Sequence, residues 1–385
     1  MARFGDGLAF GPDPVGAAEA AVHQAIESLD APPDLVCVFV SAPDPEVVAT
    51  AGRRAMQVAG AATTVGCSAT GVIGEGRGVE ETSAVTAWAA VLPGARLTPF
   101  RLDTVRTADR LAVTGLPRPE PDDRAALLLV DPYGFPVDAF VEKANEALNE
   151  LPIAGGLADG MTGRDSVRLF LDGEVFAGGA VGLLFGADVA VETLVSQGCR
   201  PIGPPMAVTR AEGNVLYELA GTPALEKLEQ VLGEVPPEDQ ELAAGGLQIG
   251  VAMDEYADRH EAGDFLVRGV VAADPSEATI SIGDVVEVGR TVRFQVRDAD
   301  TASLDLADRL AERLEQRRGK PAEAALLFSC NGRGAHMFAS GDHDVTSVRK
   351  GLELSAVAGF FAAGEIGPVG GRNHVHGFTA SLLLF

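Results

Sequence analysis

The sequence has few lysines and few aromatic residues for its length of 385 residues. Lysine occurs at only four positions, and Phe, Tyr and Trp together make up 5% of the chain. Asp and Glu number 55 against 30 Lys and Arg, so the formal net charge is −25. Because such a charge repels phosphate groups, we expect neither a nucleic acid nor a membrane surface among the partners of this chain.

Long apolar runs and paired cysteines are missing as well. No run approaches the ~18 apolar residues of a membrane-spanning helix, and residues 1–14 have neither the basic nor the apolar part of a signal peptide. The four cysteines, Cys37, Cys67, Cys199 and Cys330, are dispersed and form no C-x-x-C motif. These features predict a cytoplasmic protein with reduced thiols.

The length and the apolar content predict about two globular domains. Hydrophobic residues make up 46% and charged residues 22%, which is typical of a chain that buries a sizeable core. The run Gly203-Pro204-Pro205 interrupts any regular element. We therefore predict one domain over residues 1–203 and a second over residues 204–385.

A weak internal repeat occurs three times in the chain. Each copy has an apolar strand, a helix, a glycine-rich turn and a closing strand. The opening strands are 35–40, 125–130 and 324–329, the helices follow near 45–59, 137–149 and 345–357, the turns are 65–71, 154–160 and 358–365, and the closing strands are 84–92, 179–185 and 376–384. Glycine allows close approach of the backbone, so turns from related copies can converge on one pocket.

The alternation of strands and helices predicts an α/β fold. Many strands are apolar on both faces, which predicts sheets that are covered on both sides. We expect two related mixed-sheet halves packed as an αββα-like sandwich.

Polar residues follow the opening strand of the third copy, in Ser329-Cys330-Asn331-Gly332-Arg333-Gly334. Ligands of α/β proteins collect at the carboxyl ends of strands. Arg333 can bind a carboxylate or phosphate through two nitrogens, and Asn331 offers both a donor and an acceptor. The alternative is that Asn331 and Gly332 only form a turn.

A glycine-rich stretch near the end of the sequence carries charged residues and histidines. Glu365 and Arg372 either pair with each other or hold the ammonium and carboxylate groups of an amino-acid-like ligand. His374 and His376 lie on one side of a predicted strand. Because zinc takes three or four ligands and the spacing indicates no third, we expect no metal site.

Two cysteines lie in glycine-rich segments, where free backbone N–H groups lower the pKa of a thiol. Cys67 and Cys330 could act as nucleophiles, with His376 or His336 as the base. The alternative is that each is a small buried apolar residue.

Several of these segments together resemble the FIST family (F-box and intracellular signal transduction proteins), with an N-terminal and a C-terminal FIST region. The resemblance covers nearly the whole chain from about residue 30 onward. The matching stretches are 66–71, 196–203, 264–268, 288–298, 328–334 and 359–381. The most specific of them contains Gly-Glu-Ile-Gly-Pro-Val-Gly-Gly at 364–371 and His-Gly-Phe-Thr at 376–379.

The resemblance implies a sensory module that binds a small ligand, such as an amino-acid-like metabolite. Since no F-box, kinase, cyclase or receiver segment is evident, we expect the chain to stand alone and to pass its signal to a separate partner. The candidate ligand-binding residues are matching positions whose chemistry suits binding: Cys67, Ser68, Asn331, Arg333, Glu365, Arg372 and His376.

Three further functions stay open. The first is haem binding with a response to nitric oxide, as in some family members; here the first candidates for an axial ligand are His376 and His374, followed by Cys67 and Cys330. The second is a cysteine-dependent enzyme, and the third is a scaffold without a ligand. We expect that the protein needs no cofactor, and haem is the one cofactor that stays open as an alternative.

Overall fold

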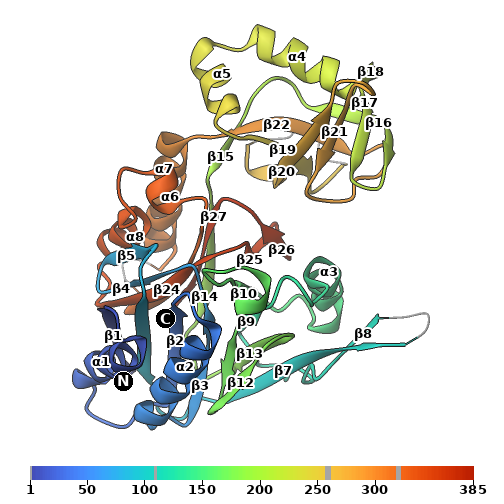
Figure 1. Ribbon diagram of the computed structural model, residues 1–385. Coiled ribbons are helices and arrows are strands. Elements are labelled where there is room, and N and C mark those ends of the chain that lie inside the picture. Colours follow the sequence, from blue (N-terminus) through green and yellow to red (C-terminus); the bar gives the residue numbers. More distant parts are fainter. Residues whose placement is uncertain (1, 108–110, 256–261, 318–321) are drawn as a thin grey trace. The chain divides into compact units, whose positions relative to one another are not determined.

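The computed structural model describes residues 2–107, 111–255, 262–317 and 322–385, which form two compact units (Figure 1). The first unit consists of Met1–Ser196, Leu306–Val375 and Thr379–Phe385, and the second of Gln197–Asp305 and His376–Phe378. The two units are defined by the contacts among their residues. The predicted boundary at residue 203 separates an N-terminal from a C-terminal region of the sequence, and it stays a prediction.

Three mixed sheets build the first unit, and each is centred on one copy of the repeat. The first-copy sheet has the order β1-β6-β2-β3-β11-β12, with Arg3–Phe10, Ala84–Val91, Leu35–Ser41, Thr63–Ser68, Leu169–Leu171 and Glu174–Phe176. The second-copy sheet is β26-β25-β10-β9-β13-β7-β8, with Arg372–His376, Glu365–Val369, Ile153–Leu157, Ala125–Val130, Ala180–Phe185, Leu97–Arg106 and Leu111–Thr114. The third-copy sheet is β14-β27-β23-β24-β4-β5, with Glu192–Gln197, Thr379–Leu384, Ala324–Cys330, Ala356–Ala362, Gly71–Gly74 and Arg77–Glu80.

The three copies have the same strand pairing. In each, the opening strand pairs in parallel with the next strand of the copy (β2 with β3, β9 with β10, β23 with β24). The closing strand then pairs antiparallel with the opening strand on its other edge (β6, β13 and β27). The repeat predicted from the sequence is therefore a repeat in three dimensions.

Each copy also gives one short strand to the sheet of another copy. β4 of the first copy pairs with β24 of the third, β11 of the second pairs with β3 of the first, and β25 of the third pairs with β10 of the second. All three of these pairings are antiparallel. The exchange is thus cyclic and ties the three copies together.

The glycine-rich segments are mainly strands, so their prediction as turns is wrong. Gly66, Gly155 and Gly359 lie on β3, β10 and β24, each opposite a residue of the parallel opening strand. A Cβ atom on these glycines would lie 1.9, 1.9 and 1.7 Å from the carbonyl oxygen of that residue. Glycine is needed here because two backbones approach closely inside a sheet.

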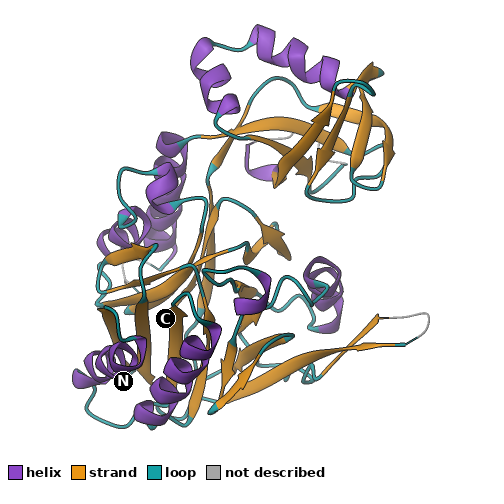
Figure 2. Cartoon of the chain, viewed as in Figure 1, coloured by secondary structure: helices purple, strands orange, loops and turns teal. Residues whose placement is uncertain are grey.

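One apolar core is shared by the three sheets. Alternate residues of the opening strands point into it, such as Phe39 of β2, Leu127 of β9 and Phe328 of β23, and all three are buried. The outer faces pack against helices: α1 (Pro14–Glu27) and α2 (Pro45–Ala59), α3 (Val137–Ala147), and α6 (Ala299–Gln316) with α8 (His343–Leu352). Figure 2 shows these helices outside the strands. The predicted α/β fold with sandwich-like packing is confirmed.

The helix predictions are correct for α2 and partly wrong for α8. Asp44 caps α2 by accepting a hydrogen bond from the Glu46 N–H at 2.8 Å, and Gly60 ends the helix with φ of 56°. In the third copy the helix ends at Leu352, and β24 begins at Ala356. The apolar residues of that stretch fit a helix or a strand equally well, and Glu353 ends the helix with φ of 56° without a glycine signal.

The second unit contains a closed sheet. Its strands are β15 (Cys199–Pro201), β22 (Thr291–Arg297), β16 (Met206–Glu212), β17 (Val215–Leu219), β21 (Thr279–Ile282), β20 (Phe265–Asp274) and β19 (Leu247–Ala252), with β18 (Thr222–Pro223) beside β17. Because β19 also pairs with β22, the strands close into a barrel. The helices α4 (Ala224–Glu234) and α5 (Pro237–Ala244) contribute residues to its core.

Within the described ranges, no helix combines the length and the apolar character that crossing a membrane requires.

Candidate functional site

The cyclic exchange makes three residues equivalent, and one of them is charged. On the exchanged strands, Val72 lies opposite Phe360, Leu169 opposite Cys67, and Glu365 opposite Gly156. Val72 and Leu169 belong to the shared core. Glu365 has an exposed fraction of 0%, so the third copy buries a carboxyl group where the other copies bury an aliphatic side chain.

Thr379 of β27 holds the Glu365 carboxyl group. Its backbone N–H and its hydroxyl group donate hydrogen bonds to Glu365 Oε2, at 3.0 and 2.7 Å. Burial raises the pKa of Glu365 to about 8, although the hydrogen bonds from Thr379, the charge of Arg333 and a hydrogen bond with Cys330 lower it. Glu365 is therefore mainly protonated at neutral pH.

Arg333 is buried beside this group and is bound by an aspartate. Its Nε and Nη2 atoms donate to Asp344 Oδ2 and Oδ1 at 2.7 and 2.8 Å. A carboxylate of the chain itself thus binds these two nitrogens, which the sequence assigns to a ligand. Burial acts against the ionised forms, but the pair's mutual attraction outweighs it, so the pKa of Arg333 is raised and that of Asp344 is lowered well below its ordinary value.

Further contacts fix the buried pair. The Ser329 hydroxyl group donates to Asp344 Oδ2 at 2.7 Å, and His343 Nδ1 lies 2.9 Å from Asp344 Oδ1. The His343 ring stacks on Phe338 with 3.6 Å between ring centroids, and the Arg333 guanidinium lies 5.3 Å from the Phe338 ring centroid. A network of this kind holds the segment after β23 rigidly in place.

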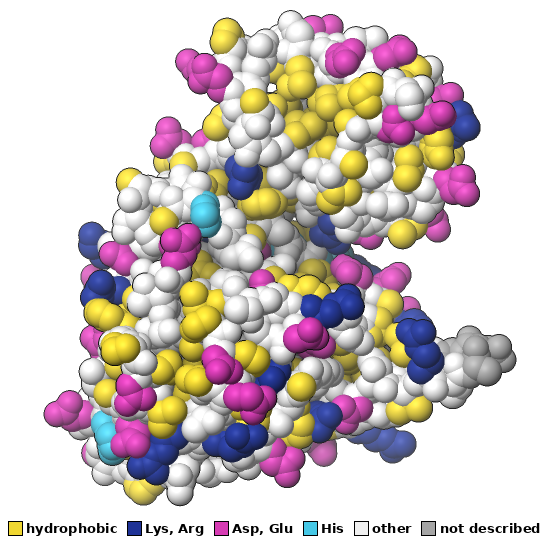
Figure 3. Space-filling model, in the orientation of Figure 1, with side chains coloured by type: hydrophobic (Ala, Val, Ile, Leu, Met, Phe, Trp, Pro, Cys, Tyr) yellow, Lys and Arg dark blue, Asp and Glu magenta, His cyan; other side chains and the backbone are white. Residues whose placement is uncertain are grey.

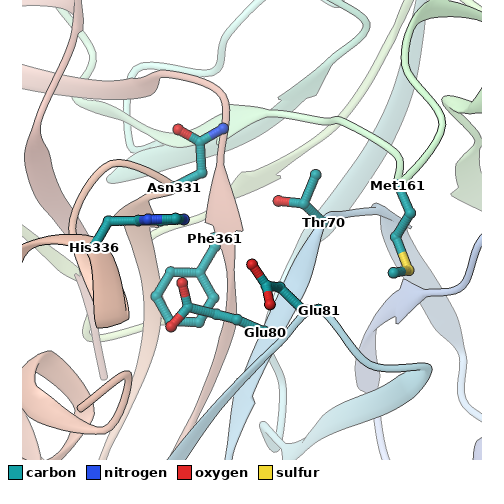
Figure 4. A pocket seen from close by; sticks show the side chains of 7 residues that line it. All are labelled: Thr70, Glu80, Glu81, Met161, Asn331, His336 and Phe361. Atoms are coloured by element: carbon teal, nitrogen blue, oxygen red, sulfur yellow. The ribbon is translucent and has the colours of Figure 1, made fainter.

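A cavity of about 450 Å³ adjoins this segment. Its lining side chains surround one space (Figure 4), and they are Thr70, Glu80, Glu81, Met161, Asn331, His336 and Phe361. We call this space the Asn331 cavity. Asn331 follows β23 directly and donates its backbone N–H to the Ala362 carbonyl at 2.8 Å. The cavity therefore lies at the carboxyl end of a central strand, where ligands of α/β proteins collect.

The lining comes from all three copies of the repeat. Thr70 belongs to the glycine-rich segment of the first copy, Met161 follows that of the second, and Asn331 and Phe361 belong to the third. Glu80 ends β5, and its Oε2 accepts the Ala335 N–H of α7 (Gly334–Met337) at 2.9 Å. The glycine-rich segments thus converge on one cavity, although they do so largely as strands.

Cys67 and Ser68 belong to the core and to an inter-copy contact. Cys67 has an exposed fraction of 0% and faces the shared core, and burial raises the pKa of its thiol well above the ordinary value. Ser68 exchanges hydrogen bonds with the Arg168 backbone, since its N–H donates to Arg168 O and its Oγ accepts from Arg168 N. Neither residue lines the Asn331 cavity.

The other candidates lie apart from one another. Arg372 is exposed at the start of β26, and no ion pair between Arg372 and Glu365 occurs among the described residues. His376 is buried and belongs by its contacts to the second unit. Of the seven candidates, the structure brings together Asn331, Arg333 and Glu365, and only Asn331 lines the cavity.

Sequence reasoning missed Glu80, Glu81, Met161 and Asp344. Two adjacent acidic residues between strand-like runs are the one available signal for Glu80 and Glu81, and it is weak in a chain with 55 acidic residues. On the face drawn in Figure 3, Asp and Glu side chains are scattered among Lys and Arg rather than gathered in one patch. Net charge alone therefore does not mark the cavity.

Two further features of the site are the placement of its metal-binding residue types and the surroundings of the Cys330 thiol. In the parts of the chain that the structure describes, no three His, Cys, Asp or Glu side chains are grouped so that they could hold a metal ion. Cys330 has an exposed fraction of 5%, and the Gly332 N–H lies 3.5 Å from its Sγ atom.

Comparisons with known proteins identify the family of this chain. The FIST N domain matches residues 34–222, and the FIST C domain matches residues 224–368. Uncharacterized protein Rv0628c of Mycobacterium tuberculosis is 42% identical over 385 residues, covering 100% of this chain and 99% of that protein. Uncharacterized protein Mb0898c of Mycobacterium bovis is 40% identical over 387 residues, covering 100% and 98%. The chain therefore belongs to the FIST family.

Proposed function

We propose that this chain is a sensory module that binds a small metabolite in the Asn331 cavity and passes the signal to a separate partner. FIST domains are associated with signal transduction and with small-ligand sensing. An amino-acid-like metabolite is the first class to test. The observation that carries the proposal is the convergence of all three copies on one cavity with polar groups in its lining.

The size and lining of the cavity support small-molecule binding. Pockets for such ligands are typically ~300–1,000 Å³ and combine apolar walls with a few placed polar groups. Here Phe361 and Met161 are the apolar residues, and Thr70 and Asn331 are neutral polar ones. Arg333 lies two residues beyond Asn331 in the sequence, and its buried pair with Asp344 keeps that segment in one conformation.

A route for the signal starts at Glu80. Its carboxylate both lines the cavity and accepts the hydrogen bond from Ala335 at the start of α7. A ligand that binds Glu80 shares this carboxylate with the Ala335 N–H and so changes the strength of the contact that holds the start of α7. A ligand shifts an equilibrium between two conformations by its difference in affinity for them.

A thermal-shift screen of the full chain tests the proposal. The panel contains amino acids, small aliphatic amines, small carboxylates, nucleotides and haemin, and a ligand at 100 times its Kd stabilises the fold by ~2.7 kcal/mol. We expect a stabilising compound whose effect is lost in Asn331→Ala and kept in Gln230→Ala, an exposed polar residue of α4. Stabilisation by haemin alone would favour haem binding instead, and no stabilising compound would contradict the proposal.

A further inference from the structure

Acidic groups predominate among the ionisable side chains of the Asn331 cavity. Among the described residues that line it, Glu80 and Glu81 are acidic, His336 is the other ionisable residue, and neither Lys nor Arg contributes a side chain. A cavity with two carboxylates, one imidazole and neither Lys nor Arg attracts a positively charged ligand more than an anionic one.

Packing holds the Glu80 carboxylate in place. Besides its hydrogen bond from Ala335, it lies against two glycines of the third copy, Gly334 and Gly341. A Cβ atom on either glycine would come within 2.5 Å of a Glu80 carboxylate oxygen. This carboxylate is therefore positioned before a ligand arrives, which lowers the entropic cost of binding.

The arginines that could bind a ligand carboxylate are placed elsewhere. Arg333 has an exposed fraction of 0% and is bound through two nitrogens by Asp344. Arg372 is exposed on β26 and does not line the cavity. A zwitterionic amino acid would find two carboxylates for its ammonium group, but its carboxylate would find no Lys or Arg in the described lining, only the His336 imidazole.

The uncharged part of the lining also suits an organic cation. Phe361 supplies an aromatic ring, and aromatic rings attract ammonium groups near their faces. Thr70 and Asn331 offer oxygen atoms that accept hydrogen bonds from an ammonium group, and Met161 gives an apolar surface for a methylene chain.

We propose, on the basis of the proposed function, that the ligand of the Asn331 cavity is a small aliphatic amine without a carboxylate, whose ammonium group is bound by Glu80 and Glu81. This assigns the ligand a chemical class different from that of an amino acid. It also gives Glu80 the role of the group that senses the ligand.

Four compounds separate the possible charge patterns: 1,5-diaminopentane, lysine (the same diamine with an added carboxylate), glutarate and 1,5-pentanediol. Isothermal titration and thermal shift with the full chain should give the strongest binding for the diamine, weaker binding for lysine, and none for glutarate or the diol. Equal or stronger binding of glutarate or the diol would overturn the amine inference while leaving the proposed function intact. Binding of no compound from this or the broader panel would overturn both.

Charge-neutral variants then test the two carboxylates. Glu81→Gln should weaken diamine binding about tenfold or more, since a hydrogen bond to a charged group is worth more than one to a neutral group. Glu142→Gln removes an equal charge from the exposed surface of α3 and should leave binding unchanged. Equal weakening of diamine binding in both variants would mean that only the net charge of the protein matters. That result would overturn the assignment of the ammonium group to Glu81. Glu80→Gln should also weaken binding, and its melting temperature without ligand reports any loss of the α7 contact.

Discussion

Arg333 and Asp344 form a two-nitrogen ion pair in the interior of the first unit, with side-chain exposures of 0% and 4%. The pair joins the segment after β23 to α8, and the Ser329 hydroxyl group adds a further hydrogen bond to Asp344. Asn331, two residues before Arg333 in the sequence, lines the cavity. The pair with Asp344 therefore holds in place the segment that shapes the cavity.

Breaking this pair should destabilise the protein strongly. In Arg333→Met, Asp344 remains as a buried charge without its cation, and such losses cost ~3–5 kcal/mol. Chemical denaturation of the variant measures the change in the free energy of unfolding. Arg313→Met serves as the control, because Arg313 pairs with Glu192 near the surface, with exposures of 28% and 40%, and such pairs contribute only ~0–1 kcal/mol. Similar losses in both variants would contradict this account.

The buried Glu365 should make stability depend on pH. Its pKa is about 8 in the folded protein and near the ordinary value of 4.5 in the unfolded chain. The folded state therefore keeps a proton that the unfolded state releases, so the contribution of Glu365 is fully present below pH 4.5 and is lost as the pH rises toward 8. The slope is ~1.4 kcal/mol per pH unit within that range.

Glu365→Gln should remove this slope, since glutamine resembles the protonated side chain and does not ionise. Urea unfolding of both proteins at several pH values between 5 and 8 measures the difference, which should grow with pH in favour of the variant. Glu142→Gln, on the exposed surface of α3, should keep the slope of the unchanged protein. A Glu365→Gln variant with that same slope would show that Glu365 ionises normally.

Much of the fold follows from local sequence signals. Asp44 and Pro45 begin α2, and the order of strands and helices in each copy is confirmed. The cyclic exchange could not be predicted, because β4, β11 and β25 have only four, three and five residues and pair with strands far away in the sequence. The glycine-rich segments were predicted wrongly because glycine is typical of turns, whereas here it relieves a close approach of two strands.

The candidate site was less accessible to prediction. Asn331 could be predicted because a polar residue directly follows an apolar strand. Asp344 contacts Arg333, which is 11 positions away in the sequence, and Glu80 contacts Ala335, which is 255 positions away. No local spacing in the sequence links the members of either pair. Arg372 is a candidate because it matches the family stretch and its guanidinium can bind a carboxylate, but its exposed position on β26 depends on the tertiary structure.

Cysteine labelling should separate a structural role of Cys67 from a catalytic one. Cys37 and Cys67 each have an exposed fraction of 0%, and burial raises the pKa of both thiols. Treatment of the native protein with iodoacetamide at neutral pH, followed by mass spectrometry, should leave both unmodified, and unfolding in urea should expose them. Rapid modification of Cys67 in the native protein would instead favour the cysteine-dependent enzyme.

Substitutions of the equivalent glycines should test the threefold arrangement of the first unit. Gly66→Ala and Gly359→Ala place a Cβ atom 1.9 and 1.7 Å from a backbone carbonyl oxygen, which the neighbouring strand cannot avoid without moving. We expect both variants to lose the cooperative unfolding transition, measured by circular dichroism. Gly233→Ala is the matched control, because nothing lies within 4 Å of its Cβ position on α4. This control should gain ~0.5–1 kcal/mol from the higher helix propensity of alanine. If Gly66→Ala and Gly359→Ala unfolded as cooperatively as Gly233→Ala, the close strand pairing that the copies share would be wrong.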